Sequence, residues 1–305
     1  MTKHISISIK YKEQHMINQV IDQSNTYVKD KAFNRVHEQP IYTKNKAIDL
    51  EGINCDYDQL IQTHKSICND KNRVIAIVGK GYKLVQNAEI IPDFESAIYR
   101  SNLDTTNMTR EIKQSHSGAR IVCTYIFPAH TIEITPGDYV ALKISILNSY
   151  DGSWKFTSIL GALRYACKNG LVIGNYFSSF YGKHTKGLDT DIAIKQLEDF
   201  LDVFLNNAQV WKQYPSISVS ELQANNVFIS LAGESEKLLE LLQSTYDFYS
   251  QSIGNNLWAL FNTVTDWSSH AKFRNLQNIA STVIAREKRV RKILPMIEKI
   301  RLSGN

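Results

Sequence analysis

The sequence lacks the long apolar segments that secretion and membrane insertion require. No uninterrupted apolar run approaches the about 18 residues of a membrane-spanning helix. The first residues, MTKHISISIKYKEQH, alternate isoleucine with serine and lysine and contain no small-residue cleavage site. We therefore expect a soluble, cytoplasmic protein without a membrane partner.

Cysteine, proline and glycine are also scarce. The four cysteines are Cys55, Cys68, Cys123 and Cys167, and no C-x-x-C pair supplies the close spacing of a structural zinc site. We predict that they are reduced and buried, because disulfide frameworks are unusual in cytoplasmic chains of this size. Six prolines and 14 glycines in 305 residues leave no obvious long linker, and 43% hydrophobic residues are typical of a globular protein.

Catalytic motifs are missing as well. The stretch GNYFSSFYGKHT contains the glycines of a nucleotide-binding loop, but seven residues separate Gly174 from Gly182, and His184 stands where the Mg²⁺-binding hydroxyl belongs. There is no G-x-S-x-G or H-E-x-x-H motif, and the central strands carry almost no acids for a two-metal site. We predict no catalytic residue, metal or cofactor, and therefore no enzyme.

Local patterns predict the elements of the first part of the chain. Helical spacing of apolar residues predicts a helix over 56–68. Two β-rich runs around Gly79-Lys80-Gly81 predict a hairpin over 72–87. A helix follows over 90–102, with Pro92 in its first turn.

The centre of the chain alternates with a period of two and predicts strands. These cover 118–128, 131–135 and 138–159, the last divided by an Asp-Gly turn at 149–152. Alternation within the last region places Val140, Leu142, Ile144 and Ile146 on a core face and Lys143 on an outer face. The run TSILGALRYACKNG, residues 157–170, predicts a helix that stops at Asn-Gly.

From Asp189 onward the apolar period becomes helical. We therefore predict an α+β protein, with a twisted antiparallel sheet, a crossing helix that gives a β-β-β-α-like core, and an all-helical C-terminal half. The predicted divisions are an N-terminal arm over 1–50, the α+β core domain over 51–187 and the helical region over 188–305.

Positive charge is concentrated although the net charge is only +5. The window from Lys143 to Lys186 contains six Lys/Arg and one acid, Asp151, and four aromatics precede its last lysines. Single-strand binders combine cations that follow the backbone with aromatic rings that stack on bases. The alternative is that the aromatics fill the core and the lysines are only solvated. The predicted nucleic-acid-binding residues are Lys143, Lys155, Arg164, Lys168, Tyr176, Phe177, Tyr181, Lys183 and Lys186.

Two C-terminal segments carry further expectations. REKRVRK, residues 286–292, is either a solvated helix face or an electrostatic contact with phosphates or an acidic neighbour. NNLWALFNTVTDWSSH, residues 255–270, predicts a core helix whose Asn262 and Asp266 cap or bond neighbouring elements.

Four stretches occur in an order typical of one family: GKGYKLVQNAEIIPDF, ALRYACKNGLVIG, KHTKG and NNLWALFNTVTDWSSH. Over about residues 70–270 the chain resembles the phage- and plasmid-associated family called domain of unknown function 932. This resemblance implies a phage, prophage or plasmid origin and no settled activity.

The order of ARIVCTYIF, VALKISIL, the Asp-Gly turn, WKFTSI and GALRYACKNG is similar in topology and composition to the single-strand annealing superfamily of RecT and Red-beta. That resemblance implies backbone contacts from Lys143 and Lys155 on a hairpin and from Arg164 and Lys168 on a helix. It also implies a homo-oligomeric ring or filament.

We therefore expect a phage-type protein of the host cytoplasm that binds single-stranded DNA and anneals it in replication or recombination. The alternative is a phage interaction module that docks a host or phage protein through its helical half, without binding nucleic acid.

Overall fold

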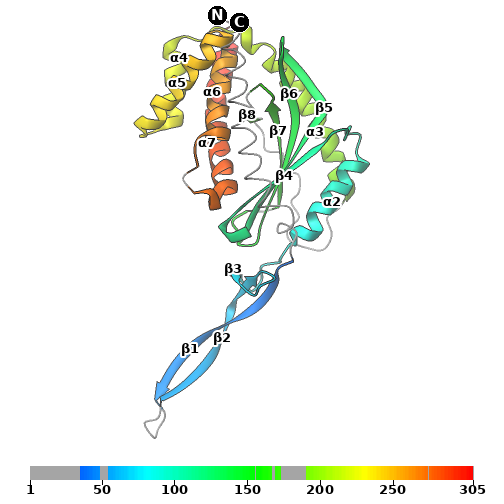
Figure 1. Cartoon of the computed structure of the whole chain (residues 1–305), viewed down its shortest axis with the longest axis vertical. Helices are drawn as coiled ribbons and strands as arrows, with labels where there is room; N and C mark the ends of the chain where they lie inside the picture. The colour runs from blue at the N-terminus through cyan, green and yellow to red at the C-terminus, as the bar shows by residue number, and fades with distance from the viewer. Residues whose placement is uncertain are drawn as a thin grey trace, which may run out of the picture.

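The computed structural model describes residues 35–48, 54–154, 156–166, 169–172, 190–273 and 275–304. A three-stranded sheet, β1-β2-β3, precedes a five-stranded sheet, β4-β5-β6-β7-β8, and helices fill the C-terminal half. The three-stranded sheet forms an arm that projects from a body made of the larger sheet and the helices (Figure 1). The α+β class and the helical C-terminal half are confirmed.

The arm consists of β1 (His37–Ile48), β2 (Asn54–Cys68) and β3 (Val74–Gly79), paired antiparallel. The helix predicted over 56–68 is therefore wrong. The spacing of its apolar residues satisfies a helix, but β1 supplies backbone partners along the segment, and this long-range pairing overrides local periodicity. The predicted boundary at residue 50 falls between the two strands of this ribbon.

A small apolar cluster attaches the arm to the body. Arm residues Val36, Ile67, Ala76 and Val78 pack with Tyr150, which belongs to the turn after β6. Towards its tip the β1-β2 ribbon projects from the body as a single layer (Figure 1). The arm is therefore anchored only at its base.

Helix α2 (Asn87–Arg100) follows the arm and confirms the predicted helix, although it begins three residues before the predicted start at 90 and Pro92 therefore lies beyond its first turn. Of the hairpin predicted around Gly79-Lys80-Gly81, only the first strand forms, and residues 82–86 have no regular structure. The hydroxyl of Tyr82 donates to the carbonyl of Ser149 at 2.7 Å, so this segment is fixed to the body by a side chain rather than by strand pairing.

The body sheet contains β4 (Thr109–Ser115), β5 (Arg120–Thr135), β6 (Asp138–Ser149), β7 (Thr157–Arg164) and β8 (Asn169–Val172). Each strand pairs antiparallel with the next along the chain. The predicted central strands are confirmed, and those at 118–128 and 131–135 join into the single long strand β5.

The helix predicted over 157–170, which was to cross the sheet, is wrong. Residues 157–164 form β7, which pairs with β6 from Thr157 opposite Leu147 to Arg164 opposite Val140. Because TSILGALR is a continuous apolar run, periodicity alone does not distinguish a buried strand from a buried helix. Arg164 and Lys168 therefore do not share a side of a helix.

Helices cover both faces of the sheet. Val140, Leu142 and Ile144 belong to the main core, together with side chains of α2 and α3 (Thr190–Trp211), which confirms the predicted apolar face. On the opposite face, Val122, Leu147 and Ile159 pack with Ala280 and Ile284 of α7 (Ile279–Ser303). This second face carries Lys143, so the prediction of an open outer face is wrong.

The remaining helices are α4 (Glu221–Ala232), α5 (Glu236–Ile253) and α6 (Leu257–His270). Ser220, Ser235 and Asn256 accept hydrogen bonds from the first turns of these helices and fix where they begin. The predicted core helix is confirmed, because α6 is buried over most of its length. Its Asn262 donates to the Trp258 carbonyl of the same helix.

Candidate functional site

Arg164, predicted to contact phosphate, forms an ion pair inside the body. Its Nε lies 2.7 Å from Asp138 Oδ1, and its Nη2 lies 2.6 Å from Asp138 Oδ2. The indole Nε1 of Trp258 donates to the same carboxylate at 2.8 Å, and the guanidinium lies 5.6 Å from the ring centroids of both Tyr249 and Trp258. Because Arg164 is only 4% exposed, it joins β6 and β7 to α5 and α6 and does not belong to a surface.

Lys143 is also enclosed. Its Nζ lies 3.4 Å from Glu287 Oε1 on α7, and the two side chains are 12% and 11% exposed. A Cβ at Gly170 would lie 2.8 Å from this Nζ, and the Gly170 N–H donates to Ser269 Oγ. The glycine of the Asn-Gly pair thus makes room for the lysine and for α6. The expected accessibility of Lys143 and Arg164 is therefore wrong.

The other predicted binding residues lie outside the described residues. They are Lys155, Lys168, Tyr176, Phe177, Tyr181, Lys183 and Lys186. Their roles stay predictions.

In the C-terminal cluster 286–292, two arginines donate hydrogen bonds to backbone carbonyls at the ends of neighbouring helices. Arg286 donates to the carbonyls of Ala271 and Lys272 after α6, and Arg289 donates to the carbonyl of Leu231 in the last turn of α4. Cations that bond the free carbonyls at a helix C-terminus stabilise that helix. A purely solvated face was therefore the wrong interpretation for these two arginines.

A different basic stretch remains open to solvent. From Lys71 to Ala88 the sequence has no acid, and it includes four cations, Lys71, Arg73, Lys80 and Lys83. We name these four residues the arm-base cations. All four are exposed, and none forms an ion pair with an acid in the part of the chain that the structure describes. The sequence signal was the acid-free run itself, which the prediction of a plain hairpin overlooked.

Turn chemistry positions the first two of these cations. In the turn between β2 and β3, the Asn69 side-chain oxygen accepts hydrogen bonds from the backbone N–H groups of Lys71 and Arg73, both at 3.0 Å. Asn72 between them has a φ of 56°, which asparagine tolerates better than most residues. The turn is thus held by its own asparagines, and the side chains of Lys71 and Arg73 take no part in holding it.

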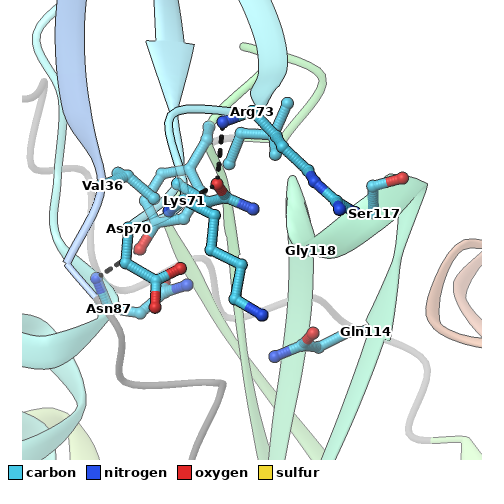
Figure 2. Close-up of a pocket in the computed structure, with 11 residues that line it drawn as sticks. Val36, Asp70, Lys71, Arg73, Asn87, Gln114, Ser117 and Gly118 are labelled. Carbon is cyan, nitrogen blue, oxygen red and sulfur yellow. Dashed lines mark hydrogen bonds between the residues drawn. The ribbon is translucent and has the colours of Figure 1, made fainter.

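A cavity of about 210 Å³ lies between this turn and the turn that joins β4 to β5. Figure 2 shows the Lys71 side chain running into it towards Gln114, and the Arg73 guanidinium extending towards Ser117. Asp70 also lines the cavity, so its charge is mixed with a cationic excess. Ammonium, guanidinium, amide and hydroxyl donors converge here, which is chemistry that binds an anion such as a phosphate.

The other two arm-base cations lie at the opposite end of β3. The backbone N–H of Lys80 donates to the Thr63 carbonyl of β2 at 2.9 Å, which places Lys80 beside the ribbon. Strand β3 has six residues, so the two pairs of cations are separated by roughly 20 Å at about 3.3 Å per residue. The cations therefore follow an elongated path instead of forming one point of charge.

Neutral tyrosines hold this region in place. Burial, followed by the nearby Asp151 and Tyr150, raises the pKa of Tyr82 to about 12, so its hydroxyl stays protonated and donates to Ser149. Burial likewise raises the pKa of Tyr150 to about 12, and its oxygen accepts a hydrogen bond from the Asn87 backbone N–H. The position of the arm base is therefore fixed by neutral contacts, which salt does not screen.

Within the described residues, no cluster of three or more His, Cys, Asp and Glu side chains has the arrangement of a metal site. No helix in the same residues is both long and apolar enough to cross a bilayer.

Comparison with known proteins identifies one family. Residues 74–293 match the model described as "Domain of unknown function (DUF932)". No curated protein matches the chain. No solved structure matches it either. The matched region includes both residues of the Arg164–Asp138 ion pair.

Proposed function

This chain belongs to the DUF932 family, a domain of unknown function, and we propose that it binds single-stranded nucleic acid through the base of its arm. DNA is the favoured strand, and annealing of complementary strands in phage replication or recombination is the favoured process. The protein acts by binding, in the cytoplasm of the host cell, without covalent chemistry.

One observation carries this proposal: four exposed cations without acidic partners among the described residues line an acid-free stretch at the foot of a projecting ribbon. Lysine and arginine that are free of carboxylates release counterions from a phosphate backbone when they bind it. Their elongated path suits a strand better than a compact anion. The aromatic and basic residues predicted over 176–186 would extend this contact, and a ring or filament of copies would lengthen it.

The alternative function is the docking of a host or phage protein on the helical half. The observation that favours it is a pair of exposed apolar side chains on one face of α4, Leu222 at 71% and Ile229 at 53%. Both proposals predict binding, but only contact with phosphates predicts a steep dependence on salt.

The test measures fluorescence anisotropy of labelled single- and double-stranded oligonucleotides over a series of salt concentrations. The test variant changes all four arm-base cations, Lys71, Arg73, Lys80 and Lys83, to glutamine. We expect the natural protein to bind the single-stranded oligonucleotide more tightly than the double-stranded one. The variant should bind more weakly, and its slope of log K against log salt should be smaller by up to about 3, at roughly 0.7 for each phosphate that is no longer neutralised.

A matched control removes the same charge from the helical half, where Lys237, Lys272, Lys288 and Lys299 are also exposed. Changing these four lysines to glutamine should leave the slope nearly unchanged. Equal losses in both variants would show that net charge, not the arm base, governs binding. Absent or salt-insensitive binding by the natural sequence would overturn the proposal.

A further inference from the structure

A cross-strand pair of large side chains lies exposed in the middle of the arm. Tyr42 of β1 is directly opposite Leu60 of β2, and they are 54% and 46% exposed. Residues directly opposite in an antiparallel ribbon project from the same face, with Cβ atoms about 5 Å apart. Together they form one apolar surface on a ribbon that, among the described residues, projects from the body as a single layer (Figure 1).

An irregularity in the ribbon adjoins this pair. Pro40 pairs with Lys65 and Tyr42 pairs with Leu60, so four residues of β2, 61–64, lie opposite Ile41 alone. Bulges of this kind bend a ribbon, increase its twist and redirect side chains. The pair therefore occupies the first regular position beyond this irregularity, and both of its side chains are exposed there.

The pair lies close to the arm-base cations. Towards the body, the Thr63 carbonyl accepts a hydrogen bond from the Lys80 N–H, where the series of arm-base cations begins. Leu60 is three residues from Thr63, or roughly 10 Å along an extended strand. The apolar pair thus extends the cationic path towards the tip of the arm.

We infer that Tyr42 and Leu60 form a stacking platform for one or two nucleobases of a single strand whose phosphates contact the arm-base cations. This inference rests on the proposed function and adds a binding mode to it. A tyrosine ring stacks on any base, and a leucine beside it covers the base edge, so the contact does not depend on sequence. Bases in a duplex are already stacked, and the platform therefore favours single strands.

The test uses oligonucleotides that carry the fluorescent base 2-aminopurine, whose emission falls when it stacks. The natural protein should quench this emission on binding. The double variant Tyr42→Ala and Leu60→Ala should lose the quenching and bind a single strand at least fivefold more weakly, the equivalent of about 1 kcal/mol for one stacked base. Because neither residue is charged, the salt slope should not change.

Two further variants separate stacking from damage to the arm. Tyr42→Trp keeps an aromatic face and should retain both the affinity and the quenching. The double variant Tyr99→Ala and Leu302→Ala removes a tyrosine and a leucine that are exposed on the body, at 65% and 62%, and should behave as the natural protein does. Salt-dependent binding with unchanged affinity and quenching in the Tyr42, Leu60 variant would overturn this inference alone. No binding by the natural protein would overturn the proposed function first.

Discussion

In the body, Arg164 and Lys143 each face a carboxylate across a buried contact. At the arm base, by contrast, Lys71 and Arg73 line a cavity and form no ion pair with an acid among the described residues. Both groups come from stretches of sequence that are poor in acids. The difference lies in what the fold brings to them. The acid for Arg164 is Asp138, just before the basic window, and the acid for Lys143 lies 144 residues away on α7.

This comparison shows why a count of charges in a window does not define a binding surface. The 143–186 window has one acid of its own, yet both of its described side chains that were expected to contact phosphate obtain acidic partners from outside it. The arm base has no such partner within the described part of the chain, although body residues such as Gln114 and Ser117 line the same cavity. The body elements next to these cations present amide and hydroxyl groups to them instead of an ion-pairing carboxylate.

The largest expected effect comes from removing a buried cation of the body, which tests whether that cation is structural. Arg164→Met should lower the free energy of unfolding by about 3–5 kcal/mol, because it leaves Asp138 buried and uncompensated. Urea denaturation measures this change. Lys237→Met, at an exposed position, should stay within about 0.5 kcal/mol of the natural protein.

A partial recovery should follow when the acid is changed as well. The double variant Arg164→Met and Asp138→Asn should be more stable than Arg164→Met alone, since no buried charge is then left without a partner. An Arg164→Met protein as stable as the natural one would mean that this cation is not structural, and the contrast between the regions would fail.

The arginines of α7 test the same comparison with a smaller effect. Arg289→Met should cost about 1.5–3 kcal/mol, because a guanidinium that bonds the Leu231 carbonyl is removed from the end of α4. Thermal or urea unfolding provides the measurement, and its neighbour Lys288→Met, which is exposed, provides the control. Equal stability of the two variants would place Arg289 on a solvated face, which is one of the two alternatives that the charge run left open.

Much of the fold follows from local patterns, and the exceptions have one physical cause. The strands of the centre, the helices of the C-terminal half and the buried α6 agree with their periodicity. The segments 56–68 and 157–164 were predicted as helices but are strands, because each gains a partner strand from elsewhere in the chain. The pairing of a strand with its neighbour depends on where the fold places both strands, and the hydrophobic period of either segment does not reveal it.

The candidate site was predicted less well, for a related reason. Lys143 and Arg164 were correctly identified as unusual cations, but their partners Glu287 and Asp138 become visible only when the helix and the strands are placed. The arm-base cations could have been found from the absence of acids between Lys71 and Glu89. The exposure of these four side chains could not be predicted from the sequence, because it depends on how the fold places the base of the arm.

The smallest expected effect concerns the attachment of the arm. Tyr82→Phe removes the hydroxyl that donates to the Ser149 carbonyl, a loss of about 1 kcal/mol. The loss should be local, with roughly fivefold faster hydrogen exchange at β3 amides and unchanged exchange in α6. Tyr99→Phe, at a position 65% exposed on α2, is the control, and equal exchange in both variants would contradict an anchoring role.

The same hydroxyl gives the arm a dependence on alkaline pH. Burial and the neighbouring Asp151 and Tyr150 raise the pKa of Tyr82 to about 12, above its ordinary value of 10.0, so the folded state favours the protonated form. Its contribution to stability is therefore complete below about pH 10 and is lost as the pH rises through about 12. β3 of the natural protein should lose its protection over that interval, whereas the Tyr82→Phe protein should lack this part of the change.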